Sequence, residues 1–167
     1  DSFKPALKYL QSKPSVIGQT SITDKLEVFR ETYIYDSWIK GIGRIESDPD
    51  GALTSARTLV ETTCKFILKK LSIPFEIDTD LPKLCKLTIG ALNVSPDPLT
   101  KEAFMRIFNG CYTAIEGIGE LRNKLSDSHG KDEGFKKPLR RHAELTVNLS
   151  GTLSVFMLET LESQLKD

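Results

Sequence analysis

The chain has 167 residues, the size of one ordinary domain that closes a buried core without metals or disulfides. The charges of its 23 basic and 23 acidic residues cancel. This balance excludes a strongly basic protein that coats nucleic acid and a protein dominated by a polyanionic tail. With 39% hydrophobic and 28% charged residues, the composition is that of a soluble globular protein and is too apolar for a disordered one.

Residues 1–46 predict two helical stretches with a loop between them. A short helix is expected around Ala6–Leu10, followed by a loop over the polar stretch Gln11–Thr20, which contains a proline and a glycine. From Asp24 onward apolar residues recur at helical spacing. The apolar set of this second predicted helix is Leu26, Phe29, Tyr33, Ile42 and Ile45. We expect these 46 residues to form an N-terminal helical extension, with the domain proper at 47–167.

The strongest helical pattern follows the punctuating segment Ser47–Gly51, whose side-chain oxygens are suited to capping a helix. Charged residues spaced by four predict a solvated ladder in which Glu61 pairs with Arg57 or Lys65. The opposite, buried face is expected to consist of Ala52, Ala56, Leu59, Val60, Thr63, Cys64, Ile67 and Leu71.

Three more helices are predicted after Pro74. Asp80 can cap a shorter helix that runs through Leu92, Thr100 can cap the next, and Pro138 can start a final helix over Leu139–Leu165. The apolar set of the helix after Thr100 is Phe104, Ile107, Phe108, Cys111, Ile115, Ile118, Leu121 and Leu125. Its three glycines each cost about 1 kcal/mol against alanine, so we expect them to allow close approach of another backbone. They are Gly110, Gly117 and Gly119.

The cysteines and the hydropathy pattern predict where in the cell the protein is found. Cys64, Cys85 and Cys111 lie far apart in apolar stretches and lack zinc-ligand spacing, which predicts buried, reduced thiols in a cytoplasmic protein. The longest charge-free run, Leu145–Leu158, has 14 residues and several polar side chains. A membrane span needs about 20 predominantly apolar residues, so no membrane association is expected.

Several familiar motifs are present only in part. The carboxylates of Asp48 and Asp50 lack the further ligands of a calcium loop and are better explained as helix caps. Gly117-Ile-Gly119 has no third glycine and no preceding strand, so a phosphate loop is disfavoured. The consecutive residues Ser126–His129 include the types found in a hydrolase triad, but neighbours on one loop cannot readily align as nucleophile, base and orienting group.

Arg122 and His129 offer a different chemistry. They supply a permanent cation and a group with an ordinary pKa of roughly 6.5, which are the tools for metal-free RNA cleavage. Attack of a ribose 2′-hydroxyl on the adjacent phosphate needs proton transfer and a cation where charge gathers. On a continuous helix the two side chains would lie roughly 10 Å apart along the axis, so the chain must turn after Leu125 or two subunits must contribute.

Local charge supports this interpretation. Residues 122–142 carry a net charge of +4, so the remainder of the chain carries −4. A dimer that joined two such segments would form a +8 groove on an acidic body and would bind RNA selectively and with strong salt dependence. The alternative, a solvated basic loop with a surface histidine, is the more common situation and is favoured by spacing alone.

Four segments resemble the abortive-infection C-terminal family, which is similar in turn to the HEPN ribonuclease superfamily. The resemblance covers about residues 47–162 in the right order. The segments are Asp48–Lys65, Leu81–Leu84, Leu121–Gly130 and Arg141–Leu149.

The resemblance implies an all-α, HEPN-like helical bundle of five or six helices, usually homodimeric, with an Arg-x(4–6)-His motif in a cleft between subunits. Here the motif would be Arg122 and His129, with six residues between them. His129 would act in proton transfer or in positioning the 2′-hydroxyl, Arg122 would hold the scissile phosphate, and Asn123 would assist. No cofactor or metal is implied.

Basic residues in and just after the motif are candidate RNA contacts. These are Lys124, Arg140, Arg141 and His142; for the last three a surface at a helix start is an equally good explanation. Arg57 and Glu61 match the family pattern and are better explained as a structural pair.

The implied activity is that of a metal-independent endoribonuclease in a prokaryotic antiphage or toxin–antitoxin system, with RNA as substrate. A neutralising antitoxin or a fused effector is a further possible partner. The alternative is a non-catalytic HEPN-like module that dimerises and binds a partner protein or RNA, and thereby regulates an effector. The near-neutral surface fits that alternative, because a promiscuous ribonuclease would carry more general positive charge.

Overall fold

The computed structural model describes residues 16–30, 32–95, 97–126 and 138–166, and within these ranges it holds helices and no strand. At 16, 17, 118, 119 and 121–126 it describes the backbone only. The prediction of an all-α bundle of five or six helices is confirmed. The helices are Val16–Leu26 (α2), Tyr33–Arg44 (α3), Pro49–Lys70 (α4), Leu81–Ala91 (α5), Pro98–Ser126 (α6) and Arg140–Lys166 (α7), with a 3₁₀ turn at Glu27–Phe29 (η1).

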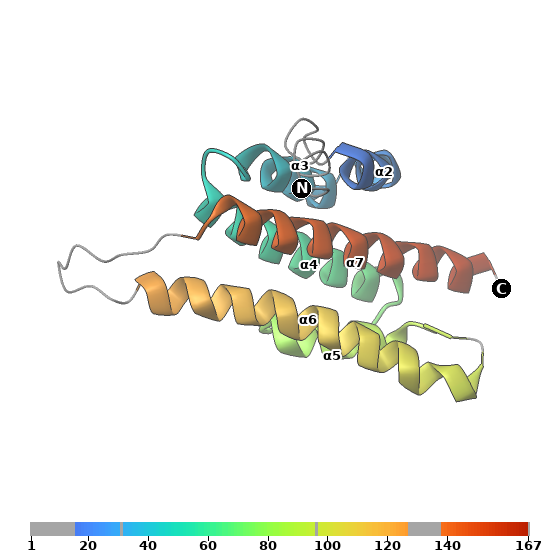
Figure 1. The fold of residues 1–167 in the computed structure, drawn as a ribbon. Coiled ribbons are helices and arrows are strands. Elements are labelled where there is room, and N and C mark those ends of the chain that lie inside the picture. Colours follow the sequence, from blue (N-terminus) through green and yellow to red (C-terminus); the bar gives the residue numbers. More distant parts are fainter. Residues whose placement is uncertain (1–15, 31, 96, 127–137, 167) are drawn as a thin grey trace, which may run out of the picture.

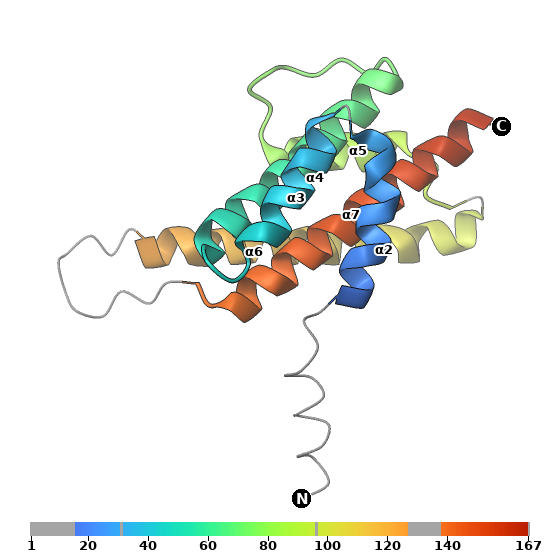
Figure 2. The same ribbon diagram turned by 90° about the horizontal axis from the view of Figure 1, so that it is seen from above.

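The helices form three layers, and α4 and α7 make up the middle one (Figure 1). Figure 1 shows α2 and α3 on one side of this central pair and α5 and α6 on the other. Helix α4 contacts α3, α5, α6 and α7, so it is the central element of the bundle. Figure 2, seen from above, shows α3 running along α4 while α2 crosses α7. Because α3 lies before residue 47 and packs on both central helices, part of the expected N-terminal extension belongs to the same core.

Helix α4 forms as its pattern predicted. The Asp48 side chain accepts a hydrogen bond from the Gly51 backbone N–H at 3.0 Å, and Pro49 occupies the first turn, where its missing N–H costs nothing. Every residue predicted for its apolar face is buried except Leu71, which is half-buried. The segment Ser47–Gly51 is therefore a helix cap, as expected.

The tightest packing against a helical glycine occurs at Gly151 in α7, where a side chain and not another backbone approaches. A Cβ atom at Gly151 would lie 2.4 Å from Cζ3 of Trp38, whose ring is fully buried and donates a hydrogen bond from Nε1 to Thr23 Oγ1 at 2.8 Å. Gly110 and Gly117, by contrast, have nothing within 4 Å of a Cβ position. The expectation of tight packing at those two glycines is wrong, because α6 lies on the outside of the bundle there; the surroundings of Gly119 are outside the described residues.

The N-terminal boundaries differ from the sequence prediction. Helix α2 begins at Val16, inside the stretch expected to be a loop, and the helix expected from Asp24 onward is interrupted after η1. Thr32 has extended backbone angles and its side chain accepts from the Ile34 N–H at 3.3 Å, so a new helix starts there. Tyr33, predicted to face the core, is 77% exposed at this helix start. The short helix expected at Ala6–Leu10 lies outside the described residues.

The C-terminal helices also start slightly away from their predicted positions. Helix α6 begins at Pro98 because Asp97 Oδ1 accepts from the Leu99 N–H at 3.0 Å, whereas Thr100 was expected to cap it. Phe108 and Ile115 are buried, but Ile107 is 63% exposed, so the predicted apolar face of α6 is only partly covered. Among the described helices none is long and apolar enough to cross a membrane.

Candidate functional site

The last turns of α6 carry the first half of the Arg-x6-His motif. Arg122, Asn123 and Lys124 are consecutive residues of this helix, which ends at Ser126. Their backbone is helical, and His129 lies outside the described residues. Of the three positions assigned to catalysis by the resemblance, Arg122 and Asn123 are therefore placed at one end of the bundle, and the roles of both, like that of His129, remain predictions.

The start of α7 lies at the same end of the bundle as the end of α6. Figure 1 shows the two helices running antiparallel, with the end of α6 and the start of α7 at the left. Two aromatic contacts hold them in this arrangement: the Phe156 ring lies 6.5 Å from Phe104 and 5.7 Å from Phe108, centroid to centroid. The structure thus brings the predicted RNA contacts at 140–142 to the end of the molecule where the backbone of Arg122–Lys124 lies in the last turns of α6 (Figure 1).

Arg140 is engaged by two carboxylates. Its Nη1 lies 2.9 Å from Glu144 Oε2, and its Nε donates a hydrogen bond to Glu46 in the turn between α3 and α4. The hydrogen bond to Glu46, followed by the charge of Glu144, raises the pKa of Arg140. Because two acids offset its charge, Arg140 is a less available phosphate ligand than Arg141, which is exposed and has no ion pair with any described residue.

His142 has a structural hydrogen bond at the start of α7. Its Nδ1 accepts from the Leu139 backbone N–H at 3.2 Å, and its side chain is half-buried. This interaction satisfies one of the backbone donors left free at a helix start. The imidazole therefore serves the helix start through Nδ1, and only Nε2 is left to meet a ligand.

An ion pair fixes α6 to α4 just before the motif. Arg57 Nη1 lies 2.6 Å from Glu116 Oε1, six residues ahead of Arg122. The prediction that Arg57 pairs with Glu61 is wrong, because Arg57 reaches across to α6 while Glu61 pairs with Lys65 at 2.5 Å. Beside this pair, burial and then the Glu116 charge raise the pKa of Tyr112, so its phenol stays protonated. The cluster is structural: it anchors the helix that carries Arg122.

Two acidic partners were missed by the sequence reasoning. Glu116 and Glu46 lie 59 and 94 residues from the arginines that they contact. Pairing rules that work within one helix operate over three or four residues, so no local spacing could identify either partner.

The cysteines take no part in this site. The Sγ atoms of Cys64 and Cys85 lie 3.8 Å apart between α4 and α5, and both residues are buried. The hydrogen bond to Cys64 and then burial raise the pKa of the Cys85 thiol. Cys111 is only half-buried, which corrects the prediction that all three are buried. In the part of the chain that the structure describes, no group of three His, Cys, Asp or Glu side chains could hold a metal ion.

Comparison with known proteins gives one match. No curated protein and no solved structure matches the chain. A family of HEPN-like domains, the abortive-infection C-terminal family, matches residues 32–161, from the start of α3 into the last turns of α7. This match begins earlier than the boundary expected near Ser47 and includes α3, which packs on α4 and α7. The chain therefore belongs to the abortive-infection C-terminal family of HEPN-like domains.

Proposed function

We propose that the protein is a metal-independent endoribonuclease of a prokaryotic antiphage or toxin–antitoxin system, with Arg122 and His129 as its catalytic residues. The observation that carries this proposal is the position of Arg122 in a HEPN-like domain: it lies in the last turns of α6, at the end of the bundle where α7 starts with Arg140 and Arg141. Residues 122–142, which join these two helix ends, carry a net charge of +4.

The proposed reaction is an internal transfer within the RNA. The ribose 2′-oxygen attacks the adjacent phosphorus as its proton is removed, and the bond from phosphorus to the 5′-oxygen breaks as that oxygen receives a proton. The products are a 2′,3′-cyclic phosphate and a 5′-hydroxyl. His129 moves a proton, Arg122 stabilises the negative charge that develops on the phosphate oxygens, and Asn123 helps to position the phosphate.

A homodimer would complete this site, and the exterior of α6 and α7 supports one. Ile107 of α6 and Leu145 of α7 are exposed, at 63% and 58%, and Phe104 is 40% exposed where it stacks on Phe156. Exposed apolar side chains on two neighbouring helices are the kind of surface that protein interfaces cover. Pairing two copies through this face would supply two Arg122/His129 motifs for one RNA strand.

The test is cleavage of RNA by the purified protein in the presence of EDTA. We expect wild type to release products that end in a 2′,3′-cyclic phosphate, and both Arg122→Ala and His129→Ala to lose at least about 100-fold in rate. Arg106→Ala is the matched control, because Arg106 is an exposed arginine in the first half of the same helix. It should cleave as wild type does.

Three outcomes would contradict this proposal. Cleavage that is equal in all variants would indicate a contaminating nuclease, and cleavage that disappears with EDTA would indicate metal chemistry. RNA binding without any cleavage by wild type would favour the alternative, a non-catalytic module that binds RNA or a partner and regulates an effector.

A further inference from the structure

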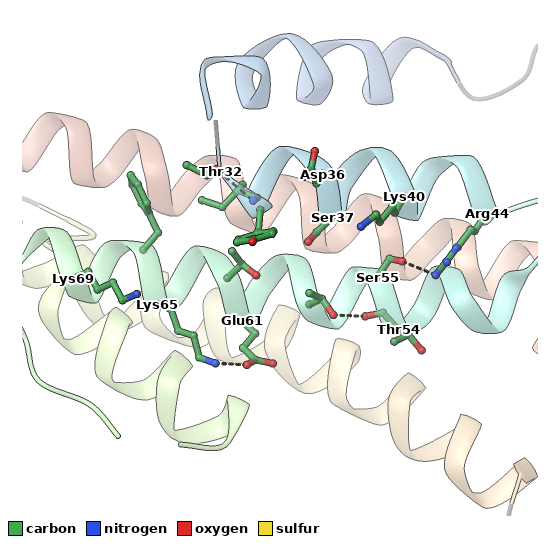
Figure 3. Close-up of a pocket in the computed structure, with 15 residues that line it drawn as sticks. Thr32, Asp36, Ser37, Lys40, Arg44, Thr54, Ser55, Glu61, Lys65 and Lys69 are labelled. Carbon is green, nitrogen blue, oxygen red and sulfur yellow. Dashed lines mark hydrogen bonds and ion pairs between the residues drawn. The ribbon is translucent and has the colours of Figure 1, made fainter. Parts of the chain in front are cut away.

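A polar groove runs between α3 and α4 and is lined by residues other than those proposed for catalysis. Its volume is about 720 Å³. Figure 3 shows that its walls come from these two helices, with Lys40 and Arg44 on α3 and Lys65 and Lys69 on α4. We call it the α3–α4 groove.

The groove carries a net positive charge, and much of this charge lies on side chains that have no ion pair with any described residue. Four basic and two acidic residues line it. Of the acids, Glu61 is paired with Lys65 at 2.5 Å, and Figure 3 shows the Asp36 carboxylate directed away from α4. Lys40 and Lys69 are exposed and form no ion pair with any described residue. Arg44 is exposed too, but it has an ion pair with Asp48 at 3.9 Å and its Nη1 donates to Ser55 Oγ at 3.4 Å. The two lysines therefore dominate the field that a ligand would meet, and the partly paired Arg44 adds to it.

Neutral groups in the groove suit a nucleic-acid strand. Tyr33, at the start of α3, presents an aromatic ring that is 77% exposed, which a base can stack on. Side-chain hydroxyls line the α4 wall at Thr54, Ser55, Thr58 and Thr62. The first three donate to carbonyl oxygens of their own helix, which leaves Thr62 to donate to a phosphate or ribose oxygen.

The length of the groove indicates an extended ligand. Its α4 wall runs from Thr54 to Lys69, about 22 Å along the helix axis at 1.5 Å per residue. The cations are distributed over this length, with Arg44 near one end and Lys69 at the other. A single phosphate would contact only one of these ends, whereas a strand of several nucleotides would contact both.

One end of the groove leads toward the proposed active site. Arg44 lies two residues before Glu46, which receives the hydrogen bond from Arg140 at the start of α7. Figures 1 and 2 both place the α3–α4 turn at the end of the bundle where α6 ends and α7 begins. A strand that leaves the end of α6, where Arg122 lies in the sequence of that helix, can therefore continue along α4 without crossing the body of the protein.

We propose that the α3–α4 groove binds a single-stranded stretch of the RNA substrate, with phosphates against Lys40, Arg44 and Lys69 and one base stacked on Tyr33. The choice of RNA as the ligand rests on the function proposed above. An acidic peptide would use the same cations but would leave the exposed tyrosine without a stacking partner, so the groove fits RNA better.

The test measures binding to an RNA that the proposed reaction cannot cleave. A fluorescein-labelled 2′-O-methyl oligonucleotide of about ten nucleotides lacks the attacking hydroxyl, so its anisotropy reports binding by the active protein. The groove variant is Lys40→Glu/Lys69→Glu, and the matched control is Lys83→Glu/Lys86→Glu on α5. All four lysines are exposed, and both variants change the net charge equally.

The groove variant should bind at least about tenfold more weakly than wild type. Its slope of log Kd against log salt should fall by roughly 1.4, because two phosphate contacts on a single strand are lost. The control should stay within about twofold of wild type. Tyr33→Ala should bind about fivefold more weakly with an unchanged salt slope, since stacking releases no counterions.

Several results would overturn the groove proposal. They are equal weakening by both double variants, no binding by wild type, and a groove variant that loses only the binding of a poly-glutamate peptide. Cleavage assays separate this proposal from the proposed function. If wild type fails to cleave RNA but the groove variant alone weakens binding, the catalytic proposal fails and the groove stands. If cleavage depends on His129 and the groove variant binds like wild type, the catalytic proposal stands and the groove fails.

Discussion

The two longest helices, α6 and α7, are nearly equal in length but are buried to very different extents. Helix α7 has 27 residues, and eleven of them are buried against the other helices. Helix α6 has 29 residues, and of its described side chains only Phe108 and Ile115 are buried. In sequence the two helices have similar apolar content, so apolar content alone does not separate a central helix from a peripheral one.

The difference separates a helix that the rest of the bundle covers from one that leaves apolar side chains exposed. Helix α7 is covered by α2, α3, α4 and α6. Helix α6 contacts only α4 and α7 among the strongest helix pairs, and it leaves Ile107 and Phe104 exposed. The α7 side of the bundle is thus a finished core, while α6 has an apolar face available to a second subunit and carries Arg122 at its end.

The largest effect expected from this comparison is on the oligomeric state. Ile107→Glu puts a charge into the proposed dimer face, and we expect the dimer to dissociate at least about 100-fold more readily, since a buried unpaired charge at an interface costs several kcal/mol. Sedimentation equilibrium measures this change. Ile77→Glu is the matched control, because Ile77 is 92% exposed in the loop between α4 and α5.

RNA cleavage by the Ile107→Glu variant should fall with its dimer fraction and recover at high protein concentration. If the variant stays dimeric, or if wild type is a monomer, the exposed face of α6 is not the subunit interface. Because Ile107 is already mostly exposed, the substitution should leave the thermal unfolding of the separated subunit unchanged.

A pair of glycine substitutions compares the same two helices by their stability. Gly151→Ala in α7 forces a Cβ against Trp38 Cζ3, and we expect it to lower the free energy of unfolding by roughly 1–3 kcal/mol. Gly117→Ala in α6 meets no atom within 4 Å and should raise it by up to about 1 kcal/mol through helix propensity. Urea denaturation of both variants measures the two values, and equal signs would mean that the helices are packed alike.

The two glycines also illustrate which features of the fold can be predicted from the sequence and which cannot. The helix α4 was predicted with its cap and its buried face, because both depend on neighbours within a few residues. The Arg-x6-His motif and its position near a helix end were likewise readable from the sequence. The glycines of α6 were misinterpreted, since whether a glycine faces another helix depends on the tertiary arrangement and not on its own helix.

The N-terminal region shows the same limit in another form. The interruption between η1 and α3 depends on Thr32, a weak cap in a segment whose apolar spacing continues through it. Trp38, fully buried against Gly151, was not singled out, because its partner lies more than one hundred positions away. The groove between α3 and α4 could not be predicted either, since Lys40 and Lys69 line the same groove only when the two helices pack.

The smallest expected effect concerns the ion pair that ties the end of α6 to the core. Arg57 and Glu116 are 40% and 24% exposed, whereas the Arg106 and Glu102 pair within α6 is more than three-quarters exposed. We expect Arg57→Gln to lower the free energy of unfolding by about 1 kcal/mol and Arg106→Gln by less than about 0.5 kcal/mol, because solvent weakens the exposed pair.

The local consequence of Arg57→Gln should be more informative than the global one. Glu116 lies less than two turns before Arg122, so loss of its partner should release the end of α6 while α7 keeps its contacts. We therefore expect faster amide hydrogen exchange over residues 117–126 and unchanged exchange over 146–161. Uniform acceleration in both helices would mean that α6 and α7 open as one unit, and the contrast between a finished core helix and a peripheral one would not extend to their local stability.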